Sequence, residues 1–262
     1  MLKKSLGQHL LVDRKLLKME ATLCMPRGKK VLEIGPGTGN LTEMLLAFGP
    51  KKLVCVEKDP DMASALEARF GASRNLQIVR VDFLEWEPDG DFDIVCGNLP
   101  YYISSKIIFK AAKMEFSRAV FCLQKEFAER IGAMPGERKY SRLSVQAGKA
   151  FDVVFRRNVP AGAFYPPPKV DSQIIALEKK TREGGGGATA SDAFVTAIFS
   201  HRKKTLRAAL AASSSALGMP KAQLAKTAES LPFSGRRVFQ LGMEEIAEAE
   251  KAVRHAAKKA KA

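Results

Sequence analysis

The sequence has few cysteines and no long apolar run, and both absences exclude classes of protein. The 262-residue chain contains 4 cysteines and 1 tryptophan. The cysteines stand far apart with no Cys-x-x-Cys pair, so the sequence predicts neither a disulfide framework nor a zinc site. Because no run of about 18 apolar residues occurs, we expect no membrane-spanning helix. The N-terminal segment is too polar for a secretory signal, and we expect a cytoplasmic protein with no membrane partner.

Acidic residues are scarce relative to basic ones. Lys and Arg number 43 against 28 Asp and Glu, which gives a formal net charge of +15 and a pI of about 9.7. Such an excess predicts a polyanionic partner, and nucleic acid is the one that we expect. A basic surface that is simply solvated is the alternative. Charge alone does not distinguish RNA from DNA.

Apolar runs alternate with helix-like segments through the first half of the chain. Strands are expected at residues 30–34, 53–57, 76–81, 92–96 and 119–123. This alternation predicts an α/β, Rossmann-like parallel sheet that is covered on both faces. Two later strands, at 151–155 and 172–177, have no helix between them. We expect them to form a hairpin-like pair, which makes the sheet mixed.

A run of glycines, Gly184–Gly187, predicts a flexible break and a domain boundary. We therefore expect a Rossmann-like domain at residues 1–183 and a small helical domain at residues 188–262. Beyond the glycines the strand signals stop. Residues 191–217, 219–230 and 243–260 are rich in Ala, Leu, Lys and Glu, a composition typical of helices.

A glycine-rich turn follows the first expected strand. Gly35, Gly37 and Gly39 allow the backbone to approach a ligand closely, and the helix that follows adds free N–H groups at its N-terminus. Dinucleotide enzymes use a related turn, but their pattern has a glycine where this chain has Asn40. The turn alone leaves S-adenosylmethionine and a dinucleotide open as ligands.

Acidic residues follow the next two strands. Glu57 ends the second strand, 22 residues after Gly35 (57 − 35), where a carboxylate can accept hydrogen bonds from both hydroxyls of a ribose. Asp82 follows the third strand, where it could accept a hydrogen bond from an adenine amino group while Phe83 gives apolar contact. Capping or surface roles are the alternatives. The order Gly, Glu, Asp at successive strand ends favours a nucleotide-like pocket.

The segment Asn98-Leu99-Pro100-Tyr101, after the fourth strand, indicates the chemistry. The amide oxygen of Asn98 and a backbone carbonyl of Asn98 or Leu99 can accept both hydrogens of an exocyclic adenine amine. Two such acceptors stabilise the positive charge that develops when the amine attacks a methyl group. Pro100 keeps Leu99 extended and has no N–H, and Tyr101 can stack on the base. An ordinary Asx-Pro loop is the alternative.

With these residues the chain resembles the KsgA-type small-subunit ribosomal RNA adenine dimethyltransferases. The similar segments extend nearly from end to end and are 6–11, 35–39, Glu57, 98–101, 123–126, 140–144, 164–172 and 199–207. The resemblance implies dimethylation of N6 in two adjacent adenosines near the 3′ end of small-subunit (16S-type) rRNA, with a role in ribosome biogenesis. It implies S-adenosylmethionine as the methyl donor and no metal. We expect a monomer that acts on a pre-ribosomal subunit.

The resemblance also assigns roles to individual residues. Phe164 matches an aromatic residue that holds the target adenine against Tyr101. Tyr102 is a local departure, since bacterial members often have Asn there. The positions that match donor contacts are His9, Leu11, Gly35, Glu57, Asp82 and Asn98. In the basic segment near residue 202, a solvated helix face is the alternative to phosphate contacts, which we expect from Arg202, Lys203, Lys204 and Arg207.

Three other functions stay open. The nearest is a large-subunit rRNA adenine methyltransferase of the antibiotic-resistance type, which the helical domain and its basic segment disfavour. A second is a non-catalytic RNA-binding assembly factor or a transcription factor descended from such an enzyme, which the intact segment 98–101 disfavours. The third is a nicotinamide oxidoreductase, and titration with S-adenosylmethionine and with NAD would distinguish it.

Overall fold

The computed structural model describes residues 9–180 and 189–259. The chain divides into two compact units. The first, here called the sheet unit, comprises Met1–Ala128 and Phe151–Lys179, and the second, the helical unit, comprises Glu129–Ala150 and Lys180–Ala262. The expected break at Gly184–Gly187 lies outside the described residues. The sequence did not predict that Glu129–Ala150 would belong with the helical unit.

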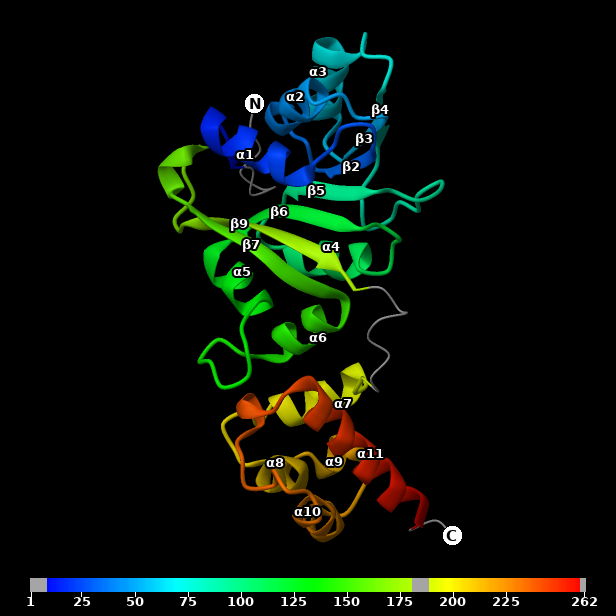
Figure 1. Cartoon of the computed structure of the whole chain (residues 1–262), viewed down its shortest axis with the longest axis vertical. Helices are drawn as coiled ribbons and strands as arrows, with labels where there is room; N and C mark the ends of the chain where they lie inside the picture. The colour runs from blue at the N-terminus through cyan, green and yellow to red at the C-terminus, as the bar shows by residue number, and fades with distance from the viewer. Residues whose placement is uncertain (1–8, 181–188, 260–262) are drawn as a thin grey trace. The chain divides into compact units, whose positions relative to one another are not determined.

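The sheet unit is built on a seven-stranded mixed sheet with the order β4-β3-β2-β5-β6-β9-β7 (Figure 1). Strands β2 to β6 run parallel, whereas β9 runs antiparallel to both β6 and β7. The expected Rossmann-like α/β class and the mixed sheet are therefore confirmed. The strands are β1 Leu10–Leu11, β2 Lys30–Ile34, β3 Lys52–Glu57, β4 Leu76–Arg80, β5 Ile94–Asn98, β6 Arg118–Gln124, β7 Phe151–Val159, β8 Phe164–Tyr165 and β9 Ser172–Lys179.

Helices α2, α3 and α4 connect parallel strands of the sheet, whereas β4 leads to β5 without a helix. Asp59 caps α3, as its position before Pro60 predicts, by accepting a hydrogen bond from the Asp61 N–H at 3.0 Å. Asp13 caps α1 in the same way, although the sequence reading did not identify this helix. The helices are α1 Arg14–Cys24, α2 Asn40–Ala47, α3 Pro60–Phe70, α4 Ser104–Ala111 and α5 Lys125–Ile131, whose last residues belong to the helical unit.

One face of the sheet packs against α1 and α2. Apolar side chains of both helices form a single buried cluster with residues of β2, β3, β5 and β6. All four cysteines are buried free thiols. Glu20 of α1 and Glu33 of β2 are also buried, with exposed fractions of 0% and 1%. These two carboxyls are exceptions in an otherwise apolar layer.

The strand order determines where a ligand can bind. From β2 the chain moves outward to β3 and β4, and it then returns to β5 on the other side of β2. The carboxyl ends of the strands on either side of such a reversal leave a crevice in open α/β sheets. Gly35 follows β2 and Asn98 ends β5, so the two motifs identified in the sequence meet at this crevice.

Two short strands join the start of the described chain to the segment that precedes β9. β1 and β8 pair antiparallel, with Leu11 opposite Phe164. Asn40 links β1 to the glycine turn, because its side-chain nitrogen donates to the Leu11 carbonyl at 2.9 Å. The residue that departs from the dinucleotide pattern therefore has a structural role here.

The helical unit has an apolar core of its own, formed by side chains of α6, α7, α8, α10 and α11. The helical stretch expected at 191–217 forms three shorter helices, because residues 201–204 form a turn. Within residues 9–180 and 189–259, no helix combines the length and the apolar character that a bilayer crossing requires. The helices are α6 Arg142–Ala150, α7 Asp192–Phe199, α8 Leu206–Ala212, α9 Ser214–Leu217, α10 Lys221–Glu229 and α11 Met243–Lys259.

Candidate active site and nucleic-acid surface

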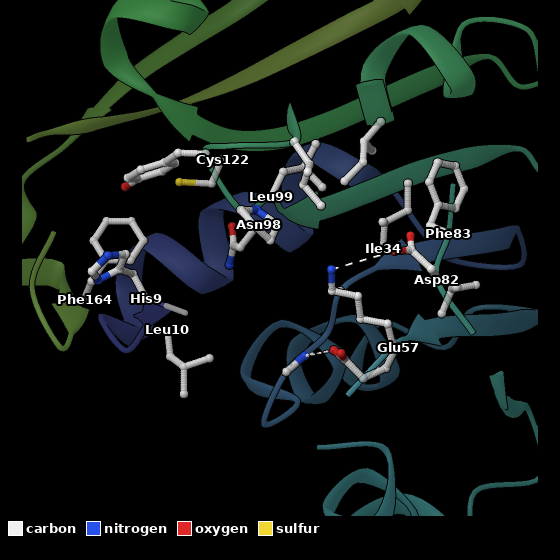
Figure 2. Close-up of a pocket in the computed structure, with 18 residues that line it drawn as sticks. His9, Leu10, Ile34, Glu57, Asp82, Phe83, Asn98, Leu99, Cys122 and Phe164 are labelled. Atoms are coloured by element: carbon white, nitrogen blue, oxygen red, sulfur yellow. Dashed lines mark hydrogen bonds and ion pairs between the residues drawn. The ribbon is translucent and has the colours of Figure 1, made fainter. Parts of the chain in front are cut away.

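A cleft lies in the sheet unit, at the crevice between β2 and β5 (Figure 2). Residues after the carboxyl ends of β2, β3, β4 and β5 line it, together with residues near β1 and β8. In the part of the chain that the structure describes, His, Cys, Asp and Glu form no group of three that could hold a metal. The predicted site residues that line the cleft are His9, Gly35, Gly37, Glu57, Asp82, Phe83, Asn98, Leu99, Pro100, Tyr101 and Phe164.

Glu57 holds the glycine turn in place. Its carboxylate accepts hydrogen bonds from the backbone N–H of Gly37 at 3.0 Å and from that of Asp59 at 2.9 Å. Burial raises the pKa of Glu57, and the two backbone hydrogen bonds oppose that shift. Each carboxylate oxygen retains a further lone pair for a ligand hydroxyl.

The residues after β3 and β4 form one end of the cleft. Asp82 accepts a hydrogen bond from the Leu84 N–H at 2.9 Å, and its second oxygen lies 3.7 Å from Nζ of Lys58. Lys58 also donates to the Tyr102 hydroxyl at 3.1 Å. The buried ring of Phe83 completes the lining. Lys58 was not predicted, because nothing but its place after Glu57 distinguishes it from a surface lysine.

Asn98 lies between the two ends of the cleft (Figure 2). The chain leaves the sheet here, and the Leu99 N–H still donates to the Cys122 carbonyl at 3.2 Å. The Pro100 carbonyl accepts hydrogen bonds from the Ile103 N–H and the Ser104 hydroxyl, which lead into α4. Within the described residues, no hydrogen bond reaches the Leu99 carbonyl. That carbonyl is therefore available as an acceptor beside the Asn98 amide.

Aromatic rings form the other end of the cleft. The Tyr101 hydroxyl lies 2.6 Å from the Ser172 hydroxyl, and burial raises the pKa of Tyr101. The His9 ring stacks near Tyr101, with 6.0 Å between ring centroids, and its Nδ1 lies 2.8 Å from the Pro166 carbonyl. Phe164 is buried and lines the cleft. This end offers flat apolar surfaces, as stacking on a base requires.

Leu11 does not line this cleft. Its side chain is buried in the core, and its carbonyl already accepts the hydrogen bond from Asn40. It lines a smaller adjacent hollow together with Thr38 and Asn40. The donor contact that the resemblance implies for Leu11 stays a prediction.

Two buried carboxyls of the sheet unit were not identified from the sequence. Glu33 accepts hydrogen bonds from the Thr42 hydroxyl at 2.7 Å and from the Cys55 thiol at 3.4 Å, and burial raises the pKa of Glu33 to about 7. Burial, and then repulsion by Glu33, raise the pKa of Glu20 well above its usual value. An isolated acid in a helix or strand is usually a surface residue, so only the fold reveals their burial.

We expect protein stability to decrease as the pH rises through the titration of Glu33. The folded-state pKa of about 7 exceeds the ordinary value of 4.5, so the folded state binds this proton more tightly than the unfolded state does. The contribution of this proton to the free energy of unfolding is complete below about pH 4.5 and is lost by about pH 7. The loss is about 1.4 kcal/mol per pH unit, or roughly 3 kcal/mol in all. Denaturant titrations of wild type and Glu33→Gln in acid and in weakly alkaline buffer measure it. If the free energies of unfolding of the two proteins differ by the same amount at both pH values, Glu33 does not have the raised pKa.

The basic segment forms a turn rather than a helix. Thr205 pairs with Arg237 as an isolated antiparallel bridge, and the Val238 N–H donates to the Lys204 carbonyl at 3.0 Å. Arg237 is thereby placed beside Lys203 and Lys204, and all three are exposed. Arg237 was not predicted, because it lies more than thirty residues further along the chain.

Two of the four cations expected to contact RNA have protein partners. Arg202 donates to the backbone carbonyls of Arg138 at 3.0 Å and Tyr140 at 2.8 Å. Arg207 forms an exposed ion pair with Glu229 at 2.8 Å. Such a pair exchanges easily for a phosphate, whereas Arg202 also maintains the fold of the helical unit. Phosphate contacts by either residue stay a prediction.

Comparison with known proteins identifies the family. The family model described as ribosomal RNA adenine dimethylase matches residues 1–229. The chain belongs to this family. A relative from Methanopyrus kandleri named "Probable ribosomal RNA small subunit methyltransferase A" is 38% identical over 259 residues, which is 97% of this chain and 93% of the relative. A relative of the same name from Methanosarcina mazei is 39% identical over 244 residues, or 92% and 89% of the two chains.

Two solved structures are similar to this chain over almost its whole length. A dimethyladenosine transferase from Plasmodium falciparum matches with a TM-score of 0.81 and 30% identity, covering 95% of this chain and 98% of that one. The 23S rRNA methyltransferase ErmE matches with a TM-score of 0.70 and 26% identity, covering 94% and 99%. Because ErmE matches over nearly the whole chain, the helical domain does not by itself disfavour a large-subunit target, contrary to the argument from sequence.

Proposed function

We propose that this rRNA adenine dimethylase transfers methyl groups from S-adenosylmethionine to N6 of two adjacent adenosines near the 3′ end of small-subunit rRNA. One observation supports the reaction above all. A single cleft joins a glycine-and-carboxylate end to an aromatic end, with the Asn98 amide between them. The names of the archaeal relatives support the small-subunit target. A monomer acting in the cytoplasm on an assembling subunit is part of the same proposal.

The methyl donor would bind at the end formed by the turns after β2, β3 and β4. The Glu57 carboxylate faces this end with lone pairs to spare, which suits the two hydroxyls of a ribose. Asp82 would accept a hydrogen bond from the donor's adenine amine, with the Phe83 ring against the base. Gly35 and Gly37 leave room for the donor's chain. His9 and Leu11 would complete the donor contacts.

The target adenine would stack on Tyr101 and Phe164. Its N6 then lies between Oδ1 of Asn98 and the carbonyl of Leu99, which accept its two hydrogens. The N6 lone pair forms a bond to the methyl carbon, the carbon–sulfur bond breaks, and its electron pair passes to sulfur. The alkylated nitrogen is acidic and releases a proton to water. Positioning for in-line attack supplies much of the rate, and a second round gives dimethyladenosine.

The proposal is tested by incubating the protein with isotopically labelled S-adenosylmethionine and immature small ribosomal subunits. We expect label on N6 of adenosine near the 3′ end of the small-subunit rRNA. Parallel reactions contain large ribosomal subunits in place of small ones. Parallel binding titrations compare NAD with S-adenosylmethionine. Label on large-subunit rRNA, on cytosine or on protein, or binding of NAD in place of S-adenosylmethionine, would reject the proposal.

Neutralising the three exposed cations at the basic turn is expected to weaken the salt dependence of RNA binding. Each phosphate contact that is lost lowers the slope of log affinity against log salt by about one. The variant is Lys203→Gln, Lys204→Gln and Arg237→Gln. A control with the same change in charge is Lys221→Gln, Lys226→Gln and Lys251→Gln, all of which are exposed in the same unit. Equal slopes for the two variants would place the RNA surface elsewhere.

A further inference from the structure

Glu20 is a buried carboxyl that the proposed reaction does not use. It belongs to α1 and has an exposed fraction of 0%. An unpaired carboxyl in an apolar layer destabilises the fold, so a buried one is normally found with a hydrogen-bonding partner. Here that partner is Asn98: with its amide in the orientation that satisfies both of its ends, the nitrogen donates to the two carboxyl oxygens of Glu20 at 2.9 and 3.1 Å.

This contact determines which end of the Asn98 amide faces the cleft. The nitrogen of an amide only donates and its oxygen only accepts, although the two ends have the same shape. The donating orientation is turned over from the one drawn in Figure 2, in which the oxygen faces only acceptors and the nitrogen only donors. Asn98 lines the cleft and Glu20 does not. With the nitrogen on Glu20, the end left for the cleft is Oδ1.

The contact holds in both protonation states of Glu20. Burial and Glu33 raise the pKa of Glu20, whereas the hydrogen bond from Asn98 opposes that shift. A carboxyl retains an accepting oxygen whether or not it is protonated. A neutral Glu20 could instead donate to Oδ1 of Asn98, but the amide nitrogen would then face only donors. The donating orientation of the Asn98 amide is therefore favoured throughout.

We propose that Glu20 is a positioning residue that holds the Asn98 amide with Oδ1 toward the target amine. The proposal rests on the function proposed above for Asn98. An amide free to turn would present its NH₂ group to the hydrogens of N6, which is repulsive. When Oδ1 is already held toward the amine, the amide does not have to turn during the reaction, and the cost of turning it is absent from the barrier. Loss of Glu20 is therefore expected to lower kcat and to leave the binding of donor and RNA unchanged.

The test is Glu20→Leu, which fills the same apolar site but accepts no hydrogen bond. We expect kcat to fall about tenfold, in the range found when a group that orients a functional side chain is removed. In protein labelled with ¹⁵N-asparagine, hydrogen exchange of the Asn98 side-chain NH₂ should be slow in the wild type and fast in the variant. Dissociation constants for S-adenosylmethionine and RNA should not change.

Two further variants separate positioning from packing. Cys24→Ala removes a buried side chain one turn along the same face of α1, and it should alter neither kcat nor the Asn98 exchange. Glu20→Gln keeps a carbonyl acceptor, and it should retain most of kcat and the slow exchange. Should the leucine variant not fold, Glu20→Met, an unbranched apolar side chain of similar length, replaces it as the test variant, with the same expected losses of kcat and of slow exchange.

The outcomes distinguish this proposal from the proposed function. Unchanged exchange in Glu20→Leu, or an equal loss of kcat in Cys24→Ala, would overturn the positioning role. In an Asn98→Ala background, Glu20→Leu should lower the residual kcat no further, and an additive loss would also overturn it. A wild type that shows slow Asn98 exchange but does not methylate rRNA would instead reject the proposed function.

Discussion

Replacement of Asn98 by alanine is expected to lower kcat by about a hundredfold or more. The reason is that Oδ1 of Asn98 interacts most strongly with N6 as positive charge develops on it, so the loss falls on the transition state. The affinities for S-adenosylmethionine and for RNA should change little. Single-turnover methylation rates, with dissociation constants measured by titration, separate the two effects.

Asn75→Ala is the matched control for this experiment. The Asn75 side chain donates to the Pro50 carbonyl at 3.0 Å, and the residue precedes β4 at the amino ends of the parallel strands, away from the cleft. Its kcat should equal that of the wild type. Because Asn98→Ala also removes the partner of Glu20, its free energy of unfolding should be measured beside the rates. A parallel decrease in kcat and in RNA affinity would contradict the role given to Asn98.

Gly97→Ala is expected to lower the free energy of unfolding by about 3 kcal/mol. Gly97 lies in β5 with a φ of 154°, and a Cβ there would lie 2.3 Å from the carbonyl oxygen of Ile34 in β2. Atoms that are not bonded do not approach so closely, so β2 and β5 must separate where the cleft begins. We therefore also expect weaker binding of S-adenosylmethionine.

The control for Gly97→Ala is Gly162→Ala. A Cβ at Gly162 would have no atom within 4 Å, and its φ is not in the left-handed range. Its free energy of unfolding should lie within about 0.5 kcal/mol of the wild-type value. Midpoints of chemical denaturation, compared at equal slopes, measure both variants. A Gly97→Ala protein as stable as the wild type would refute the expected contact between β5 and β2.

The sequence predicted most of the sheet, because a buried strand is a local pattern. The run 119–123 is apolar throughout, and 30–34 is apolar except for Lys30 and Glu33. The order of the strands makes their carboxyl ends neighbours, which is why Gly35, Glu57, Asp82 and Asn98 could be expected at one site. The helix α1 was missed although Asp13, its cap, was visible in the sequence.

What the sequence did not predict depends on partners far apart in the chain. Glu20 meets Asn98 across 78 positions (98 − 20), and no local pattern indicates such a pair. Arg202 looks like a free cation until its carbonyl partners in the loop near residue 138 are known. Membership of Glu129–Ala150 in the helical unit likewise depends on packing, because the only composition break in the sequence lies near residue 184.

The short β1–β8 ladder has a consequence for how the two substrates influence each other. Phe164, expected against the target base, is paired with Leu11, whose carbonyl is hydrogen-bonded to Asn40 at the first turn of α2. We therefore expect a shift of the base-stacking ring to be transmitted to the glycine turn that would surround the methyl donor. On that expectation, occupancy of one half of the cleft should slow the departure of whatever occupies the other.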